Sequence, residues 1–548
     1  MRPLDWWVLA GTILFIVSYG IWKARRSATT SEYLLAGKSM PWYAMALSIM
    51  ATQASAVTFI STTGQAYVDG MRFVQFYFGL PLAMILISIT AVPIFHRTQV
   101  YTAYEYLEKR FDPKTRALVS IIFLIQRGLA VGVVLYAPAI VLTVIFGWPD
   151  QWTTFIMGAI VIAYTTFGGI KAVTWTDFQQ MLIMFAGLLS ALVMAVHLLP
   201  TDVSFVDALR LAGAAGRLNA VVTTFDWNDR YNLFNGLLGG MFLALAYFGC
   251  DQSQVQRYLT GKSIAQSRLS LLFNAVAKIP MQFLILLVGA IVFVFFIFEK
   301  PPIVFHQIER GKIEQRANYP ELARRYDEAF QDRRSGAREF IESGNPLPFR
   351  QAHAEMERVR KEAAAGVIDT NYIFLSFVTR YLPAGLVGLI LAVILGAAMS
   401  AISAEINSLA TVSVIDIYRR FLAPSAGDSH TLYASRLATV FWGLYAVATA
   451  SLGRNLGSLI EAVNMLGSLF YGSLLGVFVL AFFFSRVRGT AAFFGVLTGQ
   501  AVVFWVFKFT GISFLWYNVI GALVVIATGL LLSAASPQSG AAQHSEPA

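Results

Sequence analysis

Long apolar stretches alternate with short polar loops along nearly the whole chain. A helix needs about 20 apolar residues to cross roughly 30 Å of hydrocarbon. By that measure the pattern predicts thirteen membrane-spanning helices, at residues 5–22, 42–67, 73–97, 116–145, 151–168, 175–198, 233–250, 267–297, 384–419, 428–452, 456–484, 488–509 and 514–533. The expected fold class is therefore an all-α polytopic membrane protein with about 13 transmembrane helices.

One polar segment interrupts this pattern. Residues 299–369 hold 26 of the 72 charged side chains, and the stretches 319–338 and 351–364 have helical composition. No catalytic constellation stands out among their alternating charges. The segment is therefore expected to form a solvated helical cap outside the membrane.

The composition excludes an ordinary soluble enzyme. Of 548 residues, 57% are hydrophobic and 13% are charged, whereas soluble domains carry about 25% charged residues. The net charge of +10 comes from basic residues that flank apolar spans, so topology explains it better than a nucleic-acid partner. A single cysteine, Cys250, excludes an internal disulfide and a cysteine-based metal cluster. We therefore expect no cofactor.

The basic residues also predict an orientation, because Lys and Arg in short loops stay on the cytoplasmic side. Loops that hold Lys23, Lys109 and Arg257 form the richer of two alternating sets, and loops that hold Arg72 and Arg210 form the poorer set. The first apolar stretch is expected to be a retained helix rather than a cleaved signal. The N-terminus and the polar segment are then expected outside a cell membrane and the C-terminus inside.

Ionisable side chains within the spans are candidates for function, because burying them in lipid costs a few kcal/mol. The candidates are Arg127, Asp177, Lys278, Glu405 and Glu461. Arg127 needs a carboxylate, an open cavity or an anionic ligand. Asp177 could instead cap a helix, and Lys278 could bond carbonyls freed by a proline kink. Glu405 and Glu461 have no evident partner in the sequence.

Two spans are unusually polar at mid-membrane. The second span reads SIMATQASAVTFISTTGQAY, and the span at 384–419 places Ser400, Ser403 and Asn407 on one helical face. An unwound helix in the second span would expose carbonyl oxygens, which are the ligands that a hard cation needs. Small-residue helix packing explains either span alone. The two together favour an ion site.

Several ordered motifs resemble the sodium:solute symporter family, which includes sodium–glucose, proline, monocarboxylate and sialic acid symporters. They are AGKSMPWY (36–43), YEYLEKRF (104–111), GGIKAVTWTDFQQ (168–180), DQSQVQRYL (251–259) and NSLATVSVIDIY (407–418). The resemblance covers residues from about 30 to 490. It implies two inverted five-helix repeats and transport by alternating access.

The implied repeats set the expected domain boundaries. The repeats occupy residues 42–198 and 233–484, and the second contains the external insert at 298–372. The flanking parts are an N-terminal helix and cytoplasmic loop at 1–41, an external loop at 199–232, two peripheral helices at 485–533 and a disordered tail at 534–548.

The resemblance also implies cation ligands. The family's common sodium site matches the backbone carbonyls of Ala51, Ala54 and Ala397 and the hydroxyl of Ser400. Ala401 stands where the family usually has a second hydroxyl. A second cation site matches Asp177, Ser400 and Ser403, with Ala404 in place of a further hydroxyl. Sodium coupling is expected, while a one-ion stoichiometry or proton coupling through Asp177 stays open.

A solute cavity is implied between the spans of the two repeats. Positions that match its lining are Gln53, Thr58, Tyr77, Tyr247, Phe248, Lys278 and Asn464. Arg127 adds a fixed positive charge near them, which favours an organic anion such as a monocarboxylate or an acidic sugar. The acidic residue that glucose-type members have in the third span is absent from this sequence, and Tyr77 is the residue nearest to its place. This absence weakens the case for a neutral sugar.

The expected function is sodium-coupled symport of a small organic solute, with the solute, sodium and the lipid bilayer as partners. A proton-coupled transporter is the first alternative. A solute sensor is less favoured, because the chain ends fifteen residues after the last span without a catalytic domain. A membrane enzyme is disfavoured because the spans show no paired acids and no HExxH or GxSxG motif. The absence of a P-loop points to an ion gradient as the energy source.

Overall fold

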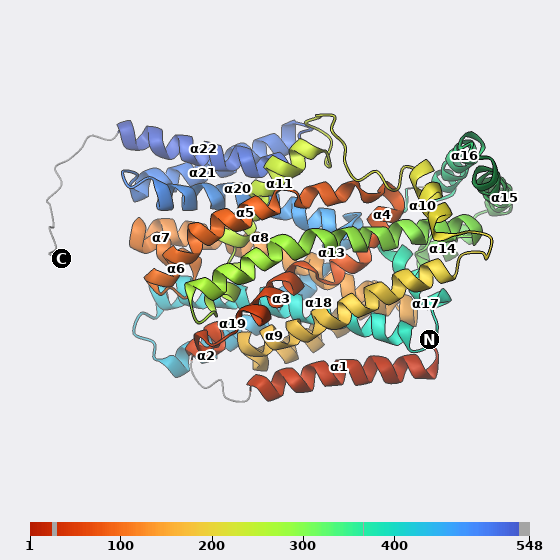
Figure 1. Cartoon of the computed structure of the whole chain (residues 1–548). Coiled ribbons are helices and arrows are strands. Elements are labelled where there is room, and N and C mark those ends of the chain that lie inside the picture. The colour runs from red at the N-terminus through yellow and green to blue at the C-terminus, as the bar shows by residue number, and fades with distance from the viewer. Residues whose placement is uncertain (25–29, 365, 536–548) are drawn as a thin grey trace.

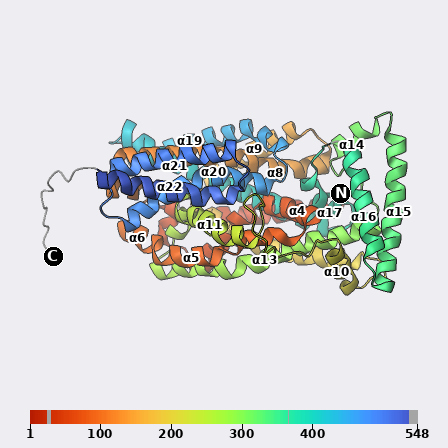
Figure 2. The same ribbon diagram turned by 90° about the horizontal axis from the view of Figure 1, so that it is seen from above.

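The computed structural model describes residues 1–24, 30–364 and 366–535. Within these ranges the chain is helical, and its long apolar helices run side by side in a bundle with a helical insert across one end (Figures 1 and 2). The predicted all-α membrane fold is confirmed. Most of the tail predicted to be disordered, residues 536–548, lies outside the described residues.

The described part of the chain contains nine helices that are long and apolar enough to cross a membrane, and a tenth span if one bent pair counts as a span. The other three predicted spans, 151–168, 233–250 and 428–452, are also helical. The first is part of a longer helical element, the second corresponds to the shorter apolar helix Asn235–Gly249, and the third lies in α19. The count of thirteen stays a prediction.

The region predicted as the first repeat opens with a broken helix. Its elements are α3 (Trp42–Gln53), the π-helical turn η2 (Thr58–Thr62), α4 (Thr63–Asp69), η3 (Met71–Tyr77), α5 (Leu80–Ile89), α6 (Ala91–Thr98), α7 (Ala103–Arg110), α8 (Pro113–Phe146) and α9 (Asp150–His197). The two halves of the broken span meet at a 59° bend. The last ladder bond of α3 joins Ala54 N to the Met50 carbonyl at 2.7 Å, so the carbonyls beyond Met50 lose their regular partners.

The element α9 covers two predicted spans. Phe146 lies four residues before the start of α9, and its ring packs on Trp6 at the N-terminal end of α1, with the two ring centroids 5.6 Å apart. Thr176 contacts Gly20 near the other end of α1. The part Ile170–His197 is long enough to cross the membrane again by itself. The predicted pair of spans therefore fits within this one element.

The region predicted as the second repeat also begins with a broken helix. Its elements are η4 (Asn235–Gly239), α11 (Gly240–Gly249), α12 (Gln252–Leu259), α13 (Ile264–Phe298), α17 (Ile373–Tyr381), α18 (Leu386–Val412), η6 (Ser413–Leu422), α19 (Asp428–Thr449), η7 (Ala450–Asn455) and α20 (Leu459–Phe483). Asp251 lies at the break and caps α12 by accepting from Ser253 N at 2.9 Å.

The position of Arg257 differs from the one that hydropathy predicts. The pattern predicts a cytoplasmic loop for this residue, yet α12 is buried along its whole length and Arg257 is 1% exposed. Hydropathy assigns this short helix to a loop because five of its eight residues are polar. The structure instead makes it the inner half of a broken span.

Peripheral helices flank the repeats. They are α1 (Pro3–Ala24), α2 (Thr30–Leu35), η1 (Ala36–Lys38), α10 (Phe205–Ala214), α21 (Gly489–Phe509) and α22 (Phe514–Ala535). Asp5 anchors α1 by accepting hydrogen bonds from the backbone N–H groups of Gly385 and Gly388 at the start of α18. The N-terminal end of α1 and the insert lie at one end of the bundle, opposite the C-terminal end of α22 (Figure 1).

The insert is a helical hairpin laid across that end (Figure 2). It comprises α14 (Gln307–Glu314), α15 (Tyr319–Ser343), α16 (Leu347–Ala364) and η5 (Thr370–Tyr372). Tyr67 on α4 packs edge-on against Phe305, with ring centroids 5.9 Å apart. A Cβ on Gly64 would lie 2.0 Å from the Thr370 carbonyl oxygen. Only glycine permits this approach, so the insert rests directly on the outer half of the first broken helix.

Candidate functional site

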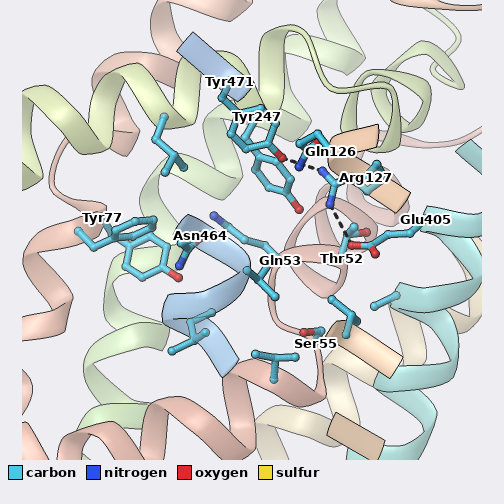
Figure 3. Close-up of a pocket in the computed structure, with 17 residues that line it drawn as sticks. Thr52, Gln53, Ser55, Tyr77, Gln126, Arg127, Tyr247, Glu405, Asn464 and Tyr471 are labelled. Carbon is cyan, nitrogen blue, oxygen red and sulfur yellow. Dashed lines mark hydrogen bonds and ion pairs between the residues drawn. The ribbon is translucent and has the colours of Figure 1, made fainter. Parts of the chain in front are cut away.

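A cavity opens beside the break between α3 and α4, where α8, α11, α18 and α20 converge. Its lining consists of Thr52, Gln53, Ser55, Val57, Phe76, Tyr77, Gln126, Arg127, Val134, Leu243, Tyr247, Ala401, Glu405, Ile460, Val463, Asn464 and Tyr471. Figure 3 shows Tyr77 and Asn464 on one side, Arg127 and Glu405 on the other, and Gln53 between them. The cavity thus has one aromatic side and one charged side.

Five of the eight residues predicted for a solute site line this cavity. They are Gln53, Tyr77, Arg127, Tyr247 and Asn464. They come from five elements that are far apart in the sequence, which is the arrangement that the inverted-repeat fold brings to its centre.

The other three matched residues lie behind the lining. Thr58 donates its hydroxyl hydrogen bond to the Gln53 carbonyl at 2.9 Å and so supports the break. Phe248 is fully buried, with its ring centroid 4.9 Å from that of Tyr247. Lys278 Nζ lies 5.1 Å from the centroid of the Tyr77 ring and has no hydrogen-bond partner among the described residues.

Arg127 is the centre of a buried charged cluster. Its Nη1 donates to Glu405 Oε1 at 3.0 Å, and its Nη2 donates to Asp251 and to the Tyr471 hydroxyl, the latter at 2.7 Å. The Tyr471 hydroxyl in turn donates to Asp251 Oδ2 at 2.8 Å. The guanidinium also lies over the Tyr247 ring, 5.6 Å from its centroid. We refer to Arg127, Asp251, Glu405 and Tyr471 as the Arg127 cluster.

These contacts limit what else Arg127 can bind. A guanidinium offers a carboxylate two forked edges, and the Nη2 group belongs to both. Because Nη2 already donates to Asp251 and Tyr471, neither edge is wholly free. Its Nε–H is buried without a partner in the described structure. A solute carboxylate can therefore bind Arg127 through two bonds only if a resident partner leaves.

Several polar atoms around the cavity are buried and unpaired within the described structure. They are Gln53 Oε1, Gln126 Oε1, Arg127 Nε, Glu405 Oε2 and Asn464 Nδ2. An unsatisfied buried polar group costs about 1–3 kcal/mol. Five of them around one cavity indicate a site built to hold a polar ligand or water.

Asp177 belongs to a second buried cluster. Its carboxylate accepts from Ser48 Oγ at 2.6 Å, from Arg257 Nη1 at 2.5 Å and from the Ser400 hydroxyl. Asp177 and Arg257 are each 1% exposed. We refer to these four residues, Ser48, Asp177, Arg257 and Ser400, as the Arg257 cluster. The aspartate matched to a cation site is therefore already neutralised by an arginine.

The residues matched to the common sodium site lie on two elements, α3 and α18, that pack against each other. The carbonyls of Ala51 and Ala54 flank the end of α3, while Ala397, Ser400 and Ala401 lie on α18, which packs against α3. Ser403 is buried one turn further along α18. Carbonyl and hydroxyl oxygens suit a hard monovalent cation. Among the described residues, no group of three or more His, Cys, Asp or Glu side chains gathers to hold another metal.

The sequence alone does not identify several members of the two clusters and of the cavity lining. Ser48, Gln126, Asp251, Arg257 and Tyr471 were not singled out, although Asp251 and Arg257 stand in the motif DQSQVQRYL. Glu405 and Glu461, which have no evident partner in the sequence, both form ion pairs in the structure.

Both glutamate contacts come from distant parts of the chain. Glu405 binds Arg127, and Glu461 accepts from Arg230 at 2.6 Å and from the Tyr231 hydroxyl at 2.7 Å. These pairs join residues more than two hundred positions apart, which spacing along a helix cannot reveal.

Comparison with known proteins identifies the family. The sequence model of the sodium:solute symporter family matches residues 33–323 and 352–499. The chain belongs to the sodium:solute symporter family. The unmatched residues 324–351 lie in the hairpin of the insert.

Curated relatives cover most of this chain. The sodium/sialic acid symporter NanT of Aliivibrio fischeri is 27% identical over 94% of this chain and 90% of its own length. The sodium/glucose cotransporter of Vibrio parahaemolyticus is 26% identical over 96% and 89%. Sodium-coupled monocarboxylate transporter 2 of Mus musculus is 28% identical over 92% and 72%.

A solved structure has the same fold. The chain of a Na⁺-coupled sialic acid symporter, described as a substrate-bound outward-open state, superposes with a TM-score of 0.77 at 23% identity, covering 98% of both chains. The protein is thus a multi-pass membrane transporter with the inverted-repeat fold, and not an enzyme. Sodium-coupled symport of a small solute by alternating access is its function.

Proposed function

We propose that the transported solute is a small organic molecule with a carboxylate, and that it binds in the cavity lined by Arg127. The observation that carries this proposal is the ring of unpaired polar atoms around the cavity, with a guanidinium at its edge. Gln53 and Asn464 supply neutral hydrogen bonds, and the Tyr77 and Tyr247 rings supply apolar contact. Lys278 supports the Tyr77 ring from behind the lining, and Thr58 and Phe248 support Gln53 and Tyr247.

The solute carboxylate would reach Arg127 by taking the place of Glu405 at Nη1. Asp251 is the less exchangeable partner, because it also accepts from Tyr471 and from the N-terminus of α12. Glu405 makes a single bond to the guanidinium, and its second carboxylate oxygen is unpaired among the described residues. Exchange at Nη1 costs one hydrogen bond and restores one.

We further propose one sodium ion per cycle. The ion would bind the carbonyls of Ala51, Ala54 and Ala397 and the hydroxyl of Ser400, while Ala401 contributes no ligand. A second ion at Asp177, Ser400 and Ser403 would have to displace Arg257, which already neutralises the aspartate. That displacement would leave a buried guanidinium without a counter-charge.

The ion and the solute would be coupled through the broken helix. The proposed sodium ligands Ala51 and Ala54 lie with Gln53 at the C-terminal end of α3, and Ala401 lines the solute cavity one residue after Ser400. Sodium bound there fixes the break and so pre-forms one wall of the cavity. Loss of the ion would loosen the wall and release the solute on the other side.

The proposed setting is the cytoplasmic membrane of a cell, with the N-terminus and the insert outside. The opposite end of the bundle carries the basic residues Lys109, Arg110 and Arg420, of which Arg420 pairs with Glu108 at 2.7 Å. An excess of basic side chains at that end agrees with a cytoplasmic position.

Thermal stability of the purified protein in NaCl and in choline chloride tests the proposal. Carboxylates, sugars and amino acids are added one at a time. A ligand that binds the folded state raises its stability by about 2.7 kcal/mol at a hundredfold excess over Kd. We expect carboxylate-bearing solutes to stabilise the protein in NaCl and not in choline chloride. Stabilisation by neutral sugars alone would contradict the proposed solute class, and equal shifts in both salts would contradict sodium binding.

Arg127→Lys separates the role of the guanidinium from that of charge alone. A lysine keeps the positive charge but has no planar fork. We expect sodium-dependent uptake into proteoliposomes to fall at least tenfold while the protein is still produced. Unchanged uptake would contradict a role of Arg127 in solute binding.

A further inference from the structure

The Arg127 cluster carries more negative than positive charge. Its single guanidinium is shared by Asp251 and Glu405, so the formal charge of the cluster is −1. All its members are buried, with Arg127 at 2%, Asp251 at 0% and Glu405 at 7% side-chain exposure. An isolated buried charge is costly, so this surplus needs a positive partner during the transport cycle.

Binding of a carboxylate solute would enlarge that need. If the solute replaces Glu405 at Arg127 Nη1, both oxygens of Glu405 are left without their ion pair. The Arg257 guanidinium does not supply the missing charge, because it is paired with Asp177. Lys278 lies against the Tyr77 ring, which is on the other side of the cavity from Glu405 (Figure 3). A positive group on the solute itself would therefore be the partner of Glu405.

The unpaired acceptors around the cavity fit one positive group in particular. Gln53 Oε1, Gln126 Oε1 and Glu405 Oε2 are three buried acceptors with no partner in the described structure. An ammonium group offers three N–H donors from one small centre. The Tyr247 and Tyr77 rings provide aromatic faces of the kind that attract cations. Among the lining residues these acceptors outnumber the unpaired donors Arg127 Nε and Asn464 Nδ2, which leaves room for a single carboxylate.

We propose that the solute is a zwitterion with an ammonium group beside its carboxylate, as in an amino acid, and that Glu405 binds the ammonium. This inference rests on the proposed function, since it concerns the same cavity. Glu405 is then a specificity-determining residue: it selects amines over the corresponding simple carboxylic acids. Arg127 and Glu405, which bind each other in this structure, each turn to one end of the solute.

Glu405→Gln tests the assignment with matched solutes. The glutamine keeps the size of the side chain but removes its charge. The probes are L-alanine, β-alanine, L-proline and L-leucine, with propionate, cyclopentanecarboxylate and 4-methylpentanoate as their amine-free partners. Kd is measured for each probe by thermal shift in NaCl. Glu461→Gln is the control, because it makes the same change at a glutamate that pairs with Arg230 and Tyr231 and does not line the cavity.

The expected result is a reversal of preference. The parent protein and Glu461→Gln should bind at least one amine at least tenfold more tightly than its amine-free partner. Glu405→Gln should bind that amine at least tenfold more weakly and the amine-free partner no more weakly than before, because its cluster is now neutral. A structural role of Glu405 alone would weaken both kinds of probe together.

Other outcomes overturn the inference. If no amine produces a sodium-dependent shift, Glu405 does not bind an ammonium group. If only the amine-free acids bind, and bind more tightly as the pH falls in the parent but not in Glu405→Gln, the positive charge is a proton on Glu405. Either result leaves sodium-coupled binding of a carboxylate standing wherever the carboxylates shift in NaCl alone. The proposed function fails separately if no carboxylate-bearing solute of any kind binds.

Discussion

The two buried arginine clusters use similar groups in different proportions. In the Arg257 cluster one aspartate faces one arginine, and the hydroxyls of Ser48 and Ser400 complete the carboxylate's hydrogen bonds. In the Arg127 cluster two carboxylates share one arginine, and one carboxylate oxygen is unpaired in the described structure. The first is neutral and away from the cavity lining, whereas the second is charged and forms part of it.

The difference shows how a buried ion pair becomes a binding device. A neutral pair whose carboxylate accepts three hydrogen bonds holds elements together, here α3, α9, α12 and α18. A cluster with a surplus negative charge and an unpaired carboxylate oxygen can be stabilised by a ligand that supplies a positive charge and a hydrogen-bond donor. The same arginine–carboxylate chemistry thus serves as a clamp in one place and as a receptor in the other.

Of the changes that test this difference between the clusters, removal of Arg127 is expected to cause the largest loss of stability. Arg127→Met leaves two buried carboxylates without a counter-charge and should destabilise the protein by about 3–5 kcal/mol. Arg257→Met leaves one carboxylate that keeps two serine donors, so its loss should be the smaller. Thermal melting of the two purified variants measures both. An equal or larger loss in Arg257→Met would show that surplus charge does not distinguish the clusters.

A titrating group outside the membrane gives the next largest effect. His353 on α16 packs between Phe293 and Phe349, and burial together with Arg333 and Arg217 lowers its pKa from 6.5 to about 4. The unfolded histidine takes a proton below pH 6.5 while the folded one does not. The stability of the insert should therefore fall by up to about 3 kcal/mol between pH 6.5 and 4.

Hydrogen exchange of α15 and α16 across this pH range checks that expectation. His353→Phe, which keeps an aromatic ring between the same neighbours, should flatten the response. A parent-like pH dependence in this variant would assign the effect to another group. Exchange in the Arg127 and Arg257 clusters should change less over the same range.

Coupling within the Arg257 cluster should give a smaller effect. Asp177→Asn leaves Arg257 without its counter-charge, and Arg257→Met does the converse. Together the two changes leave no buried charge, so the double variant should be more stable than the sum of the single losses predicts, by about 1–3 kcal/mol. Strict additivity in thermal melting would mean that the two residues do not interact as a clamp.

The smallest expected effect is a gain at the proposed sodium site. Ala401→Ser adds a hydroxyl beside Ser400, where one oxygen ligand is missing. We expect the sodium concentration for half-maximal stabilisation to fall severalfold, which corresponds to about 1 kcal/mol. Ala404→Ser, one turn further from the break, serves as the matched comparison. Equal changes in both variants would place the ion elsewhere.

The sequence predicted the membrane fold because apolar runs of about 20 residues have few other uses. It also predicted the break in the second span, where polar and small residues collect. Four residues of the cavity lining followed from the family resemblance, and Arg127 followed from its charge within a span. These signals are local in the chain.

The sequence did not predict which charged residues pair with each other. Arg127 meets Asp251 and Glu405 across 124 and 278 positions, and the partners lie on elements that only the packed bundle brings together. Hydropathy also misplaced Arg257, because a buried helix rich in Gln and Ser has the same composition as a loop. Burial of polar groups is decided by tertiary contacts rather than by composition.

Because the insert packs directly on α4, movement of the hairpin should follow movement of α4. Gly64 and Tyr67 join the outer half of the broken helix to the insert with no space between them. A swing of α4 during transport must therefore carry the insert with it or break this contact. A fluorescent dye on the exposed hairpin would follow the transport cycle in real time, and an antibody bound across it would hold the transporter in one state.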